Sequence, residues 1–166
     1  LKTTQQYGFD KYFEKFSNNS PKLVNIIAYC FMPTHPHFVL QQLADNGISI
    51  YMNRVLNSYS RYFNTLHKRK GPLWESRFKH VFVEKDEQLL HLTRYTHLNP
   101  TTAGLVKKPE DWPYSSYLEY LNSQKDYRIV DFSHLIDIEP ESYQRFVNDH
   151  KDYQKQLAQI KRLIEL

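Results

Sequence analysis

The stretch that decides the fold runs from Leu23 to Leu43 and reads LVNIIAYCFMPTHPHFVLQQL. Its first part, up to Phe31, consists mostly of β-branched, aromatic and apolar residues, which favour a strand. The run Met32-Pro33-Thr34 interrupts it, and a second extended piece follows from Pro36 to Leu43. Because the interruption is short, the stretch predicts two antiparallel strands joined by a tight connection.

Helices are expected before and after this hairpin. Aromatic residues recur at helical spacing over residues 2–20, ahead of the breaker run Asn18-Asn19-Ser20-Pro21. The clearest pattern covers residues 48–66, where apolar residues recur at steps of three and four and predict one stripe facing the core. The run Gly71-Pro72 ends this helical pattern.

Farther along, the apolar alternation over residues 79–84 predicts a strand, and Asp86 offers an N-cap for a helix from Glu87 to about Leu98. Pro100 is expected to end that helix. Weaker patterns predict helices over residues 115–121 and 141–165. We therefore expect an α+β fold, an antiparallel sheet covered by helices on one face. Residues 1–122 would form the main domain and residues 123–166 a mostly helical extension of it.

Composition narrows the class of protein. The 166 residues suit one domain, and 22 Lys and Arg against 18 Asp and Glu give a net charge of +4, which suits a polyanionic partner. Aromatic residues make up 15%, and their rings can stack on unpaired bases. The single cysteine, Cys30, lies in an apolar run, which indicates a buried thiol. A free thiol suits a reducing compartment, so we expect a cytoplasmic protein. We expect no membrane span and no export leader.

Two patterns point to chemistry. His35 and His37 lie two residues apart in an extended segment, so both imidazoles can converge on one cation; the alternative is two packed or exposed histidines. On the helix after Asp86, Gln88, His91, Tyr95 and Asn99 share one face. A tyrosine hydroxyl near a cation can be a nucleophile, and an amide oxygen can be a metal ligand. The alternative is an ordinary amphipathic helix.

A third pattern is a basic surface with aromatic residues interleaved. Cations neutralise phosphates and flat rings stack on bases, which is how proteins grip single-stranded nucleic acid. The alternative is a solvated helix face. The candidate DNA-binding residues are Arg54, Arg61, Lys68, Arg69, Lys70, Arg77 and Lys79.

From about Leu23 to Tyr120, the sequence resembles the REP-associated tyrosine transposases and related single-tyrosine HUH transposases. The segments that carry the resemblance are AYCFMPTHPHFVL (28–40), SYSRYFN (58–64), KGPLWESRFK (70–79), RYTHLNPTTAGLV (94–106) and DWPYSSY (111–117). Carried over residue by residue, it implies that His35 and His37 are the metal pair, Tyr95 is the nucleophile and Asn99 is an amide ligand.

The resemblance also implies a ferredoxin-like or RRM-like HUH nuclease core that cuts single-stranded DNA at hairpins. Cleavage would use a divalent metal, Mg²⁺ or Mn²⁺ before Zn²⁺, form a 5′-phosphotyrosine link and need no nucleotide cofactor. Relatives act as monomers or as homodimers with the tyrosine supplied in trans, and the sequence leaves both open.

The sequence departs from the family pattern at three points. Relatives carry Asn where Thr34 stands and a bulky apolar residue where Pro36 stands. They also open with a strand bearing an Asn-Arg-Gly-like turn, so we expect the native N-terminus to lie outside this sequence, with the sheet incomplete or completed by another chain. The main alternative is a domesticated, catalytically silent DNA-binding protein. An unrelated metalloprotein recruiting His80 or Glu75 is a third reading.

Overall fold

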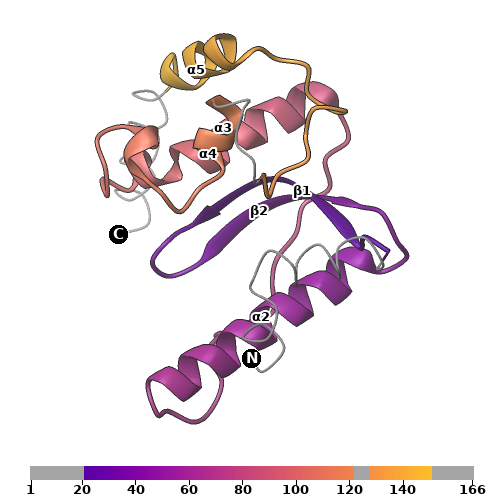
Figure 1. Ribbon diagram of the computed structural model, residues 1–166, viewed down its shortest axis with the longest axis vertical. Helices are drawn as coiled ribbons and strands as arrows, with labels where there is room; N and C mark the ends of the chain where they lie inside the picture. Colours follow the sequence, from indigo (N-terminus) through magenta and orange to yellow (C-terminus); the bar gives the residue numbers. More distant parts are fainter. Residues whose placement is uncertain (1–20, 122–127, 151–166) are drawn as a thin grey trace, which may run out of the picture.

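The computed structural model describes residues 21–121 and 128–150. In chain order, its elements are β1 (Val24–Phe31), β2 (Pro36–Gln42), α2 (Gly47–Leu66), α3 (Asp86–Thr102), the 3-10 turn η1 (Pro109–Asp111), α4 (Tyr117–Leu121) and α5 (Pro140–Asn148). The α+β class is confirmed. The helices, however, lie on both sides of the sheet and not on one as expected: α2 lies on one side, and α3, α4 and α5 lie on the other (Figure 1).

The predicted antiparallel hairpin is confirmed. β1 pairs with β2 so that Cys30 faces His37 and Phe31 faces Pro36 across the strands. The other edge of β1 bonds to the segment after η1, through a bridge between Cys30 and Ser115 and through the Phe31 N–H, which donates to the Tyr114 carbonyl at 2.8 Å. Cys30 is a free, buried thiol, as predicted.

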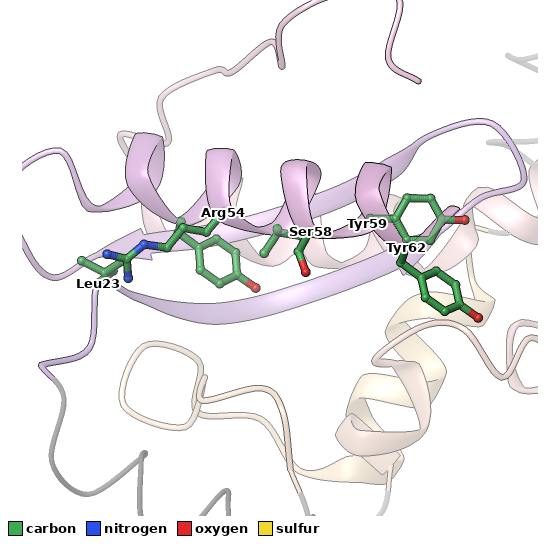
Figure 2. A pocket seen from close by; sticks show the side chains of 7 residues that line it. Leu23, Arg54, Ser58, Tyr59 and Tyr62 are labelled. Atoms are coloured by element: carbon green, nitrogen blue, oxygen red, sulfur yellow. The ribbon is translucent and has the colours of Figure 1, made fainter. Parts of the chain in front are cut away.

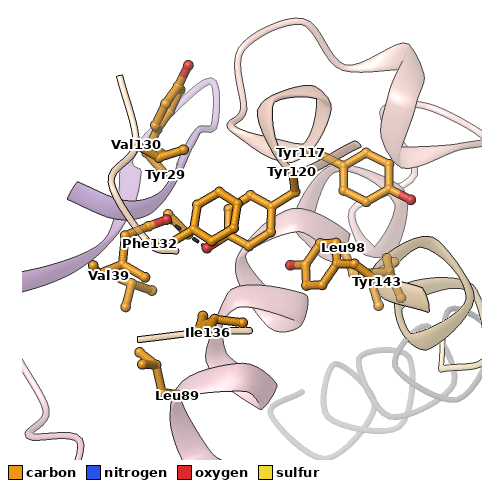
Figure 3. Close-up of a cluster of buried hydrophobic side chains, with 13 residues drawn as sticks. Tyr29, Val39, Leu89, Leu98, Tyr117, Tyr120, Val130, Phe132, Ile136 and Tyr143 are labelled. Atoms are coloured by element: carbon orange, nitrogen blue, oxygen red, sulfur yellow. Dashed lines mark hydrogen bonds between the residues drawn. The ribbon is translucent and has the colours of Figure 1, made fainter. Parts of the chain in front are cut away.

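The core lies between the sheet and the helices α3, α4 and α5 (Figure 3). Tyr120 stacks on Phe132 with ring centroids 3.7 Å apart, and its hydroxyl donates to the Ile27 carbonyl at 2.8 Å. Tyr143 from α5 and Leu98 from α3 are buried in the same cluster. Residues on both sides of 122–127 therefore contribute to one core, which fixes α3 against the sheet.

Helix α2 starts tightly against the sheet and then extends beyond it (Figure 1). A Cβ at Gly47 would collide with the Leu23 carbonyl oxygen, so the first turn of α2 needs glycine. Of the stripe predicted to face the core, Met52 is buried, whereas Tyr62 and Leu66 stay exposed in the part of the chain that the structure describes.

Two further sequence predictions were wrong. Residues 79–84 form no strand, because no strand within the described ranges lies beside them; Val81 and Phe82 are 82% and 78% exposed. Helix α3 continues through Pro100, because the Asn99 side-chain nitrogen donates to the Thr96 carbonyl, which Pro100 cannot serve.

Other predicted helices match more loosely. The helix predicted over 115–121 appears as α4, which starts two residues later. The helix predicted over 141–165 appears as α5, and its second half falls outside the described residues, as does the helix predicted over 2–20. Among the helices described, none combines the length and apolar character needed to cross a membrane.

Candidate functional site

The two histidines of the predicted metal site meet at the start of β2. His35 lies in the turn before the strand and His37 lies within it, and their Nε2 atoms are 3.0 Å apart. Two neighbouring ligand atoms of an octahedral cation, each about 2.1 Å from it, are also separated by about 3 Å. The pair therefore fits two ligand positions of one divalent ion. At this distance one ring nitrogen can also donate a hydrogen bond to the other.

The surroundings of His37 favour the neutral ring that binds metals. The Nδ1 atom of His35 lies 2.9 Å from the Thr34 hydroxyl oxygen, and a proton on Nδ1 leaves the Nε2 lone pair free. Burial, and then the charge of His35, lower the pKa of His37 to about 4. His37 is consequently neutral at pH 7.

Tyr95 lies beside this pair. Its ring meets that of His37 edge to face, with centroids 6.0 Å apart and planes at 90°. The side chain is 48% exposed, although its neighbours Arg94 and Thr96 are buried. Because α3 is anchored by those buried neighbours, the phenol is presented to solvent next to the histidines. The structure thus brings together three residues that the sequence singled out.

Asn99 follows Tyr95 by one turn, but its side chain lies along the helix. Its amide nitrogen donates to the Tyr95 carbonyl at 3.0 Å, which leaves the amide oxygen as the only atom suited to a cation. The remaining members of the predicted polar face turn to other partners: Gln88 accepts from the Glu84 N–H, and His91 lies 2.7 Å from the Arg94 guanidinium. The four side chains of this helix face therefore do not converge on one point.

No group of three His, Cys, Asp or Glu residues suited to a metal occurs in residues 21–121 and 128–150. His80 instead contacts the rings of Phe78 and Phe82, and Glu75 is exposed. Neither residue joins the histidine pair. A cation at the pair would need its other ligands from an amide, water or substrate oxygens.

The basic residues lie mainly on the α2 side of the sheet. Arg54 and Arg61 are exposed on α2, and Arg54 lines an open groove of about 720 Å³ along that helix. Figure 2 shows Arg54 near one end of this groove and Tyr59 and Tyr62 near the other. Past the end of α2, Arg69 is held by hydrogen bonds to Asn64 and Pro72.

The other predicted cations, Lys68, Lys70, Arg77 and Lys79, are also exposed. Figure 1 shows α2 reaching away from the sheet, so the cations near its far end lie on a projecting part of the molecule. The structure does not gather the basic residues and the histidines into one cluster.

Sequence reasoning missed a buried polar cluster behind Tyr95. His97 is fully buried, with Nδ1 2.6 Å from the Tyr143 hydroxyl and Nε2 2.7 Å from the Ser116 hydroxyl. The Tyr143 hydroxyl also donates to Thr93 at 3.1 Å. These bonds tie α3 to α5 and to Ser116, which directly precedes α4. The signal in the sequence was the spacing of four between Thr93 and His97, which a search for apolar periodicity passes over.

Comparison with known proteins assigns the sequence to a family. A family model described as "Transposase IS200 like" matches residues 5–99. A curated protein of Haemophilus influenzae, named as a REP-associated tyrosine transposase, is 30% identical over 102 residues, which cover 55% of this chain and 57% of the relative. The chain thus spans little more than half the length of that relative. No solved structure matches the present chain. Since the family model covers more than half of the chain, this protein belongs to the IS200-like transposase family.

Proposed function

We propose that this chain is a metal-dependent enzyme that nicks single-stranded DNA and transfers the cut strand, with Tyr95 as its nucleophile. The observation that carries the proposal is the position of Tyr95, exposed and edge to face with His37, which itself meets His35. The name of the Haemophilus influenzae relative, a tyrosine transposase, supports the same choice among the 13 tyrosines.

The proposed reaction is a transesterification at one phosphodiester. The Tyr95 oxygen forms a bond to phosphorus, and the bond from phosphorus to the 3′ oxygen breaks. The phenol loses its proton, and the leaving oxygen takes one up, so a 5′-phosphotyrosine and a free 3′-hydroxyl result. The ester energy is kept, and the DNA can be rejoined without a nucleotide cofactor.

His35, His37 and the amide oxygen of Asn99 would hold the divalent cation, Mg²⁺ or Mn²⁺. A bound cation supplies charge that stabilises the phosphate oxygens as the bond to phosphorus forms. Thr34 keeps the His35 ring in position through its contact with Nδ1. The contact of Tyr95 with His37 of the same chain favours cleavage in cis over a tyrosine supplied by a second copy.

The proposed substrate is single-stranded DNA with a neighbouring hairpin. The exposed cations Arg54, Arg61 and Lys68 would contact its phosphates, because a strip of positive charge on a projecting helix can follow a DNA backbone. Such contacts position the DNA without reading its sequence. Base recognition would need other side chains nearer the cut.

The test is cleavage of an end-labelled hairpin with single-stranded flanks in Mn²⁺, Mg²⁺ or EDTA. We expect cutting by the wild type only with metal, and loss of cutting in His35→Ala and His37→Ala. His80→Ala removes an exposed histidine outside the pair and should cut normally. DNA that shifts in a gel but is never cut would indicate a catalytically silent DNA-binding protein, and undiminished cutting by His35→Ala would overturn the metal assignment.

A further inference from the structure

We propose that Ser116 is a positioning residue for Tyr95, because its hydroxyl holds helix α3 in the orientation that brings the phenol to the histidine pair. Ser116 lies in the segment that bonds to the edge of β1 opposite β2, and its side chain is fully buried. A fully buried hydroxyl cannot touch DNA, so it would act only through α3. The inference rests on the proposed function, since it assumes that Tyr95 attacks a phosphodiester.

The Ser116 hydroxyl joins the sheet to α3. Its oxygen accepts a hydrogen bond from the Tyr29 N–H at 2.9 Å and lies 2.7 Å from Nε2 of His97 on α3. The Ser116 N–H also donates to the Tyr29 carbonyl at 3.0 Å, so the serine is fixed to β1 through its backbone as well. A hydroxyl can both donate and accept, so it can bond to His97 whichever ring nitrogen carries the proton. The link therefore holds in either tautomer.

This link differs in kind from the other contacts of α3. In residues 21–121 and 128–150, it is the hydrogen bond that connects α3 with the sheet or with a segment bonded to the sheet. Arg94, whose guanidinium lies 4.2 Å from the centre of the Phe146 ring, and His97, through Tyr143, join α3 to α5 instead. Apolar packing has no preferred direction, whereas a short buried hydrogen bond restricts the orientation of both partners. The bond to Ser116 therefore fixes how α3 is turned on the sheet.

The orientation of α3 decides where the Tyr95 phenol lies. Tyr95 and His97 are two residues apart and so about 200° apart around the helix, which places one at the surface and the other in the core. A side-chain tip about 6 Å from the helix axis moves by about 1 Å when the helix turns by about 10°. Ser116 is bonded to the part of β1 that lies beside His37 in the hairpin. It thus ties the helix that carries the nucleophile to the part of the sheet that carries the metal pair.

The experiment separates positioning from stability by measuring binding and cleavage on folded protein. Ser116→Ala removes the hydroxyl and keeps the backbone bonds to β1. With enzyme in excess over a saturated oligonucleotide in Mn²⁺, at a temperature where circular dichroism shows a folded variant, we expect cleavage about ten- to a hundredfold slower than in the wild type. Affinity for the same oligonucleotide in EDTA should be unchanged. A purely structural role would lower the melting temperature and leave the rate of the folded enzyme unchanged.

Tyr143→Phe is the matched control. It removes another buried hydroxyl that bonds to His97, but it leaves the bond between His97 and Ser116 in place. We expect it to lose stability in a thermal melt and still cut at the wild-type rate. Ser116→Cys keeps the shape of the side chain and weakens the hydrogen bond, so it replaces Ser116→Ala in the same comparison if the alanine variant does not fold.

Two results would overturn the role of Ser116 while leaving cleavage by Tyr95 standing. One is wild-type cleavage rates in folded Ser116→Ala or Ser116→Cys, with or without a change in DNA affinity. The other is equal slowing of cleavage in the Ser116 variant and in Tyr143→Phe, because that would trace the effect to a general loosening of the core. A wild type that binds the oligonucleotide in Mn²⁺ without cutting it would sink the proposed function together with this inference.

Discussion

Acidification should destabilise the fold through His97. Burial lowers the pKa of this histidine to about 3, whereas the unfolded chain binds the proton near pH 6.5. Between these values the unfolded state holds more protons than the folded state, so stability is full above pH 6.5 and falls as the pH is lowered toward 3. Each pH unit in this window costs about 1.4 kcal/mol, and the change from pH 7 to pH 5 costs about 2 kcal/mol.

Urea unfolding at pH 7, 6 and 5, followed by circular dichroism, measures this cost. His37 also has a lowered pKa, so the diagnostic quantity is the difference between the wild type and His97→Gln. Glutamine cannot titrate, and its amide retains hydrogen-bonding atoms for the hydroxyls of Tyr143 and Ser116. We expect a variant less stable at pH 7 by about 1–3 kcal/mol but with a flatter pH dependence. Equal pH slopes for the two proteins would refute the reasoning.

Three further predictions concern packing, charge and assembly. Gly47→Ala should destabilise the protein by about 1–3 kcal/mol in a thermal melt, because the added methyl meets the Leu23 carbonyl; an unchanged melting temperature would contradict that packing. Arg61→Ala should lower the slope of log affinity against log salt by about 0.7 for single-stranded DNA, and an unchanged slope would remove Arg61 from the phosphate contacts. An equimolar mixture of Tyr95→Phe and His35→Ala should cut no DNA, because both groups act in one chain; restored cutting would show a tyrosine supplied in trans.

The local sequence pattern was sufficient to predict the β-hairpin, because its two strands are neighbours in the chain. The apolar run to Phe31, the break at Pro33 and the resumption at Pro36 set the hairpin, and the register follows from the short turn. The strand expected over residues 79–84 failed because a strand depends on a partner that the segment's own sequence does not encode. The prediction that α3 ends at Pro100 failed because the Asn99 side chain donates to the carbonyl that the proline cannot serve.

Part of the candidate site could likewise be predicted from local sequence, and part could not. The spacing of His35 and His37 was readable, because two residues apart on a strand share a face. That Tyr95 reaches His37 depends on how α3 packs on the sheet, and neighbouring residues along the helix do not report it. The hydrogen bonds of His97 join segments that are far apart in the chain, which no local pattern reveals.

The most direct test of the central claim is the mass of the intact protein after incubation with Mn²⁺ and a cleavable single-stranded oligonucleotide. The wild type should gain the mass of the 3′-side DNA fragment, and peptide mapping should place it on Tyr95. Tyr95→Phe should bind the oligonucleotide nearly as well, because only one hydroxyl is lost, yet gain no mass. A covalent DNA adduct on the Tyr95→Phe protein would contradict the assignment of Tyr95 as the nucleophile.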